Sequence, residues 1–190
     1  MSAPLPQPAP GLVAVASLAQ ARRHKRKWDA VLTIEDPEAR PGDQLRFSAS
    51  PAPAHLVLSF EDADSEVFGY ATALPDDVRA ALEFARAHAG GSLLVHCFHG
   101  VGRSAAVGLA ILADRLGPGR EVEALDALAA VRPGTTPNLV AVEYADQLLE
   151  RDGALLAALL EREAGEPDTL RARQRRYDYA TQNPSLYARR

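Results

Sequence analysis

Four short apolar runs that alternate with helix-like segments are the feature of this 190-residue sequence that most constrains its fold. The runs predict strands at 11–17, 28–36, 54–60 and 92–96, and the third is apolar on both faces, as a central strand requires. Helical patterns cover the ranges 18–27, 75–89, 104–116, 121–131 and 139–163. Strands separated by helices predict an α/β fold of three layers, with a mostly parallel central sheet flanked by helices.

The chain length fits one domain with two unlike ends. Prolines at 4, 6, 8 and 10 predict a flexible N-terminal arm over residues 1–10. The catalytic domain is expected over 11–163, and a basic extension over 164–190. No apolar run reaches the roughly 18 residues that span a bilayer, and no basic residue precedes the first apolar run as in a signal peptide. We therefore expect a cytoplasmic protein with no membrane association.

Charge is distributed unevenly along the chain. From Arg171 onward there are six arginines and one acid, whereas acids are in excess over the rest. Such an extension could dock on its own domain, on a second subunit or on an anionic partner. We expect an arm of structural use, with a possible homodimer through the extension. The basic run at 22–27 is interpreted as a solvated helix face, so no nucleic-acid binding is expected.

The stretch "HCFHGVGRS", residues 96–104, contains the only cysteine of the chain. Cys97 lies at the end of a predicted strand, and Arg103 lies where the next helix begins. Gly100 and Gly102 allow a tight turn whose backbone N–H groups form a nest for an anion. The helix dipole and the arginine fork add positive potential, and cysteines in such places ionise easily. The pattern favours a thiolate nucleophile inside a phosphate-sized anion site, with the Ser104 hydroxyl placed to donate to the sulfur.

These residues resemble the His-Cys, five residues, Arg-Ser/Thr signature of the cysteine-dependent protein tyrosine and dual-specificity phosphatases. "RPGTTPNLVAVEYADQLLE" (132–150) is similar to the segment that follows this loop in small members, and "HLVLSFEDAD" to the acid loop of compact bacterial ones. The resemblance covers roughly residues 11–160. It implies a tyrosine-phosphatase-like fold and a phosphomonoester hydrolase without metal or organic cofactor. A phosphorylated protein or a small phosphomonoester would be the substrate.

The resemblance also implies a role for each matching residue. Cys97 would form a phosphocysteine, Arg103 would hold the phosphoryl oxygens, and Ser104 would help the thiolate leave. His96 would support the loop from behind, and Asn138 would help to shape it. The phosphate would be bound by Phe98, His99, Gly100, Val101, Gly102 and Arg103.

An aspartate after the third strand would protonate the leaving oxygen and then activate water. Asp62 is the first choice because it follows the strand directly, and Asp64 is the second. Glu61 and Glu66 are interpreted as solvated loop charges. His99 stands where many relatives have alanine, and the tryptophan-proline-aspartate triplet of larger tyrosine phosphatases is absent. The loop has no lysine, which favours a phosphotyrosine-like monoester over an inositol phosphate.

Three other interpretations of this loop fit the sequence less well. His96, Cys97 and His99 are too close together in sequence to share one tetrahedral metal ion easily. A catalytically silent phosphate-binding module would not need a nucleophile and two candidate acids. A sulfur-transfer enzyme of the rhodanese type also has one loop cysteine, but the six-residue step to Arg103 fits phosphate better.

Overall fold

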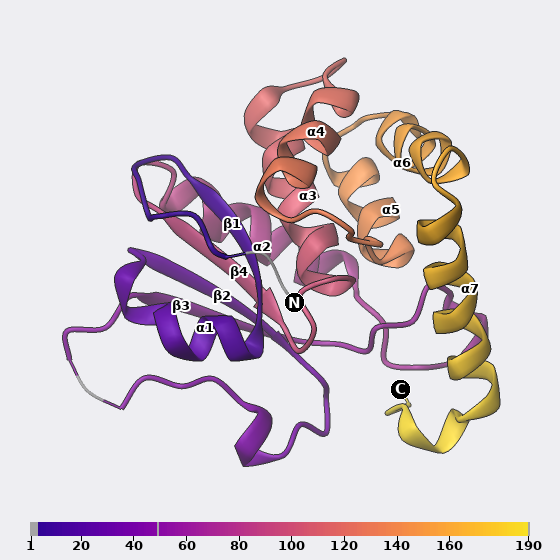
Figure 1. Ribbon diagram of the computed structural model, residues 1–190, viewed down its shortest axis with the longest axis horizontal. Helices are drawn as coiled ribbons and strands as arrows, with labels where there is room; N and C mark the ends of the chain where they lie inside the picture. Colours follow the sequence, from indigo (N-terminus) through magenta and orange to yellow (C-terminus); the bar gives the residue numbers. More distant parts are fainter. Residues whose placement is uncertain (1–3, 49, 190) are drawn as a thin grey trace.

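The computed structural model describes residues 4–48 and 50–189. Four parallel strands form one sheet in the order β1-β4-β2-β3, as Figure 1 shows. The strands are β1 (Val13–Ser17), β2 (Ala30–Glu35), β3 (Ala54–Ser59) and β4 (Leu93–Cys97). The predicted strands and the parallel sheet are therefore confirmed, within two residues at each strand end. The expectation that the third strand is central is wrong, because β3 lies at the edge of the sheet and pairs with β2 alone among the described strands.

The helices lie on both faces of the sheet. They are α1 (Leu18–His24), α2 (Pro75–Ala87), α3 (Arg103–Leu116), α4 (Glu121–Val131), α5 (Leu139–Leu148), α6 (Ala154–Ala164) and α7 (Pro167–Gln182). Single 3-10 turns cover Lys25–Lys27, Pro41–Asp43, Glu66–Phe68 and Pro184–Leu186. Within the described ranges, no helix is both long and apolar enough to cross a membrane.

Successive side chains along each strand face opposite sides of the sheet, and this produces two hydrophobic cores. Val15, Leu32 and Val95 face the large core that the helices α2 to α6 cover. Their sequence neighbours Ala14, Val31 and Leu94 face a smaller core with α1 and Trp28. Successive side chains of a strand point to opposite faces, so sandwiching the sheet buries both sets and gives the predicted three layers. Leu5 packs against the smaller core, whereas residues 1–3 of the predicted flexible arm lie outside the described residues.

The prediction of one helix over 139–163 is wrong, because the chain turns between α5 and α6. Glu150, Asp152 and Gly153 have φ angles of 54°, 51° and 87°, in the left-handed region that ends a right-handed helix. The buried Asp146 carboxylate then accepts hydrogen bonds from the backbone N–H groups of Gly153, Leu155 and Leu156, at 2.6–3.2 Å. These bonds satisfy the free amides at the start of α6.

The basic extension folds against its own domain. Helix α7 lies at the edge of the molecule, and the chain beyond it returns toward the loop that follows β3 (Figure 1). The Tyr70 hydroxyl donates to the Ala180 carbonyl at 2.7 Å, and Tyr70 forms a bridge with Arg189. The rings of Tyr70 and Tyr187 stack with centroids 4.6 Å apart. Of the three docking possibilities raised for the basic extension, the structure therefore shows the first, in which it packs on its own domain.

A polar row crosses the sheet beneath the strand ends. Thr33 Oγ1 on β2 lies 2.8 Å from His96 Nε2 on β4 and 2.8 Å from His55 Nε2 on β3. Burial lowers the pKa of His96 from its ordinary value of 6.5 to about 4. His96 is therefore neutral in the folded chain at neutral pH, and its hydrogen bond joins two strands.

We predict that replacing Asp146 destabilises the fold. Asp146→Ala leaves the buried amides at the start of α6 without an acceptor, which costs about 2 kcal/mol of unfolding free energy. Urea denaturation of wild type and variant measures this. The control is Asp126→Ala, since Asp126 is 67% exposed and paired with Arg162, a contact worth roughly 0.5 kcal/mol or less. Equal effects of the two substitutions would contradict the capping role.

We also predict an acid-sensitive contribution from His96. Between pH 6.5 and about 4 the unfolded chain binds a proton at His96 that the folded chain does not. This residue therefore lowers stability by at most about 1.4 kcal/mol for each pH unit as the pH falls through that window. Urea denaturation of wild type and His96→Asn at pH 7 and pH 4.5 checks this. The wild type must lose more stability than the variant, and parallel losses would show that His96 does not contribute.

Candidate active site

Residues 97–103 form a loop whose carbonyl groups at 98–102 accept hydrogen bonds from other parts of the chain. The carbonyl of Phe98 accepts from Leu18 N at 3.1 Å, and that of Val101 from Thr136 N at 3.0 Å. Arg132 donates to the carbonyls of His99 and Gly100, at 3.2 and 3.0 Å. The remaining carbonyl, of Gly102, accepts from Asn138 N and from Ala106 N, at 3.3 and 2.9 Å.

This arrangement fixes where the loop amides point. In a trans peptide unit, the C=O of one residue and the N–H of the next point in opposite directions. Carbonyls 98–102 turned outward therefore turn the N–H groups of 99–103 toward the centre of the loop. The one such amide with a protein acceptor confirms the direction, because Gly100 N donates to Cys97 Sγ at 3.3 Å. The Ser104 hydroxyl lies 3.1 Å from the same sulfur. The loop is thus an anion site with Cys97 at its base.

Both loop glycines are required by close neighbours. Gly100 has φ 71°, and a Cβ there would stand 2.5 Å from the Ala16 carbonyl carbon and the Ser17 nitrogen. A Cβ at Gly102 would overlap the Asp62 carboxylate and lie 2.7 Å from Arg176 Nη1. The first glycine lets the loop approach β1, and the second leaves room for the acid loop above it.

Arg103 presents one part of its guanidinium to the protein and keeps another part free. Nη1 donates to the Phe60 carbonyl at 2.8 Å and is 2.8 Å from Asp36 Oδ1. Arg103 is only 3% exposed, and its Nε has no hydrogen-bond partner among the described residues. Burial alone would lower the pKa of Arg103, but Cys97, Asp62 and Asp36 raise it, so the side chain stays charged. A buried cationic donor without an acceptor fits an anion that is bound from outside.

Asp36 is a site residue that the sequence analysis missed. It follows β2, which lies beside β4 in the sheet, so its carboxylate meets the loop at the same edge. The signal was available, because an acid directly follows the second predicted strand. Without the strand order, however, nothing distinguished that strand end from the others.

Asp62 faces the loop from the acid loop above it. The Asn138 side chain donates to Asp62 Oδ1 at 3.1 Å and to the Ala63 carbonyl at 3.0 Å. Both oxygens of Asp62 lie within 2.5 Å of the position of a Cβ on Gly102, and Asp62 lines a pocket together with Arg103. The side chain is 25% exposed, as a group that exchanges protons with substrate and water needs to be. Asn138 also caps α5 by accepting from Ala141 N at 3.1 Å, so it both caps a helix and holds the acid loop.

Asp64 has a different environment. Its side chain is 7% exposed and is surrounded by Arg173, Arg176 and the backbone N–H of Leu139, all within 3.0 Å. Glu66 is exposed and accepts from the Tyr144 hydroxyl, at 2.7 Å. The expectation that Glu61 is a solvated charge is wrong, because its carboxylate is buried and accepts from Ala188 N at 2.8 Å. Burial raises the pKa of Glu61.

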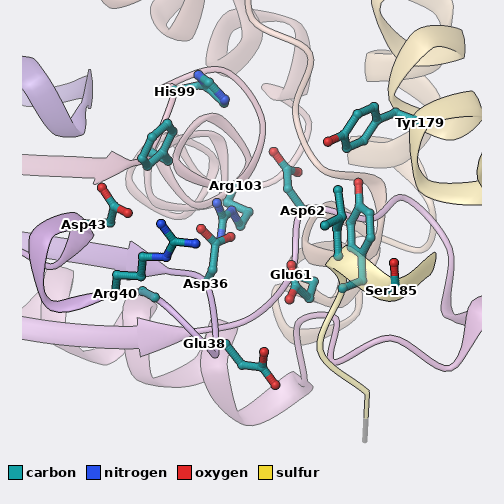
Figure 2. A pocket seen from close by; sticks show the side chains of 14 residues that line it. Asp36, Glu38, Arg40, Asp43, Glu61, Asp62, His99, Arg103, Tyr179 and Ser185 are labelled. Carbon is teal, nitrogen blue, oxygen red and sulfur yellow. The ribbon is translucent and has the colours of Figure 1, made fainter. Parts of the chain in front are cut away.

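A pocket of about 510 Å³ opens above Arg103 and Asp62. Figure 2 shows Arg103, Asp36 and Asp62 at its centre, with Arg40 and Asp43 on one side and Tyr179 and Ser185 on the other. Cys97 is buried and lies in a small adjoining hollow that shares Asp36, Asp43 and Phe98 with the pocket. The exposed His99 also lines the pocket, and His96 remains in the sheet. The C-terminal segment adds Leu186 and Tyr187 to the wall.

Solved structures with the same fold include three phosphatases by title. Tk-PTP in its active form matches with a TM-score of 0.54 and 23% identity, over 77% of this chain and 98% of that one. Human DUSP28 matches with a TM-score of 0.52 and 24% identity, over 77% and 96%. A mouse putative dual specificity phosphatase, complexed with zinc tungstate, matches with a TM-score of 0.53 and 25% identity, over 83% and 96%.

Neither a protein-family model nor a curated protein sequence gives a match to the chain. The likeness is therefore one of structure, and it confirms the fold that the signature loop implied. By its parallel sheet and the arrangement of its helices, the chain has the fold of the dual-specificity phosphatase-like proteins.

Proposed function

We propose that the chain is a phosphomonoester hydrolase that acts through a phosphocysteine intermediate. The observation that carries the proposal is the anion site itself. Gly100 N donates to the Cys97 sulfur, the Ser104 hydroxyl lies beside it, and Arg103 Nε has no hydrogen-bond partner among the described residues. Fixed donors of this kind stabilise the charge of a thiolate and of a phosphoryl group in transit.

In the first step Cys97 Sγ attacks phosphorus and the ester P–O bond breaks. Asp62 Oδ2 donates a proton to the leaving oxygen, so the alcohol or phenol departs neutral. The phosphoryl oxygens accept from the loop amides and from Arg103, whose Nη1 is held by Phe60 and Asp36. This anchoring fixes the guanidinium without using Nε.

In the second step water attacks the phosphocysteine and the S–P bond breaks. The Asp62 carboxylate takes a proton from the attacking water, which restores the acid for the next cycle. The Ser104 hydroxyl, 3.1 Å from the sulfur, donates to the thiolate as it leaves. Asp62 suits these roles better than Asp64, whose two oxygens are held by arginines and a backbone amide.

The pocket favours a phosphate carried on an aromatic ring. Phe98, Tyr179 and Tyr187 contribute aromatic surface around the entrance, and such walls bind a planar ring by stacking and edge contacts. A protein phosphotyrosine is therefore the proposed substrate, and the broader range of a dual-specificity phosphatase or a small non-protein phosphomonoester is the alternative. A cytoplasmic location remains a prediction. A homodimer through residues 164–190 also remains a prediction, and the mass of the full chain in solution would test it.

We predict that Cys97→Ser abolishes hydrolysis of p-nitrophenyl phosphate because a serine hydroxyl is not ionised at neutral pH. The loop amides and Arg103 remain, so the variant still binds phosphate, as isothermal titration can measure. Acid-quenched wild type should carry one phosphoryl group on residue 97 by mass spectrometry. Turnover by the variant would refute the mechanism. A wild type that binds phosphate but hydrolyses no aryl, peptide or lipid phosphate would indicate a silent binding module.

We predict that the two aspartates respond differently to amide substitution. Asp62→Asn removes the proton donor and lowers kcat by about 10²–10⁴-fold, with little change in melting temperature. Asp64→Asn weakens a buried pairing with Arg173 and Arg176, so it chiefly lowers the melting temperature. Steady-state kinetics and thermal unfolding of both variants separate the roles. A larger kinetic defect in Asp64→Asn at unchanged stability would reverse the assignment.

A further inference from the structure

We propose that Arg176, on helix α7 of the C-terminal extension, is a positioning residue for Asp62. The inference rests on the proposed function, because it concerns the residue assigned as general acid. It makes the extension a part of the active site.

The Arg176 guanidinium joins three elements. Nε and Nη2 donate to Asp64 at 2.7 and 2.8 Å, and Nη1 donates to the Thr136 carbonyl at 3.0 Å. Nη1 also lies 3.6 Å from Asp62 Oδ1. Thr136 N in turn donates to the Val101 carbonyl of the signature loop. One buried side chain thus ties the acid loop to the segment that supports the anion site.

The two carboxylates of the acid loop use Arg176 unequally. Asp64 takes a two-pronged contact through both of its oxygens, whereas Asp62 receives one longer contact, from Nη1 to Oδ1. Asn138 donates to the same oxygen of Asp62, at 3.1 Å. Both oxygens of Asp62 lie close to Gly102, and the two donors near Oδ1 leave Oδ2 as the oxygen that can carry the proton. Arg176 therefore helps to hold the Asp62 carboxyl group in place beside the anion site.

The site also needs a fixed positive charge at the position of Arg176. Before the first step a phosphate dianion, the thiolate and the carboxylates of Asp36 and Asp64 would repel one another if Arg103 and Arg173 were the cations paired with them. Burial alone would lower the pKa of Arg176, but Asp62 and Asp64 raise it, so it stays charged at 15% exposure. A cation beside the acid loop offsets that repulsion and keeps the loop over the phosphate.

The test compares Arg176→Gln with Arg175→Gln, which removes the same charge from the next residue, an exposed one on the same helix. The substrates are phenyl phosphate, whose leaving group needs a proton, and 2,4-dinitrophenyl phosphate, whose leaving group hardly does. Because a misplaced acid matters only where protonation is needed, we expect Arg176→Gln to lower kcat/KM about 10–100-fold on the first ester and less than about 3-fold on the second. Arg175→Gln should stay within about 2-fold of wild type on both.

A double-mutant cycle that combines Arg176→Gln with Asp62→Asn tests whether Arg176 acts through Asp62. If Arg176 acts through Asp62, adding Arg176→Gln to Asp62→Asn causes little further loss on phenyl phosphate. Equal losses on both esters, or additive losses in the cycle, overturn the assignment. If Arg176→Gln does not fold, Arg176→Lys keeps the charge but cannot make the two-pronged contact of a guanidinium. The loss of kcat/KM on phenyl phosphate relative to that on 2,4-dinitrophenyl phosphate is then the deciding measurement. A wild type that hydrolyses neither ester refutes the proposed function itself.

Discussion

The turned peptide units of residues 98–102 are the constraint on which the rest of the site depends. An anion site made of backbone amides has its carbonyls on the outside, and each buried carbonyl needs a donor. Here the donors come from the start of α1, from Arg132, from Thr136 and from the start of α5. Distant parts of the chain are therefore committed to one loop, and Arg132, at 6% exposure, supports two of its five carbonyls.

A second requirement is that the acidic groups of the site stay close together although their negative charges repel one another. Cys97, Asp36 and Asp62 surround the place where a phosphate would bind, and Asp64 stands behind them. Arg103 pairs with Asp36, and Arg176 pairs with the two carboxylates of the acid loop. The second arginine comes from beyond residue 163, so the basic extension balances the charge of the site that it covers.

The sequence was most informative where the local pattern alone decides the structure. The buried strands follow from apolar runs that the sequence shows directly. The loop from Cys97 to Arg103 could be identified because its glycines and arginine are adjacent in sequence. The turn between α5 and α6 was missed although Gly153 marks it, because the left-handed residues Glu150 and Asp152 before it carry no comparable signal in the sequence.

Residues that act across the fold could not be assigned from sequence. Asp36 reaches Arg103 only because β2 lies beside β4, and Glu61 is buried only because residue 188 returns to it. The environments of Asp62 and Asp64 differ because Arg176 of α7 binds both oxygens of Asp64 and only approaches Asp62, and the contact with Asp64 spans 112 residues of the chain. The charged residues can be seen in the sequence, but their partners lie far away along the chain and cannot be assigned from it.

The central claim is that inward amides and Arg103 hold an anion against the sulfur of Cys97. The most direct measurement is the rate of alkylation of this single thiol by iodoacetamide at neutral pH, with and without inorganic phosphate. We predict that Cys97 is alkylated and that phosphate slows the reaction, because the anion occupies the amides and Arg103 beside the sulfur. An alkylation rate that phosphate leaves unchanged would contradict the claim.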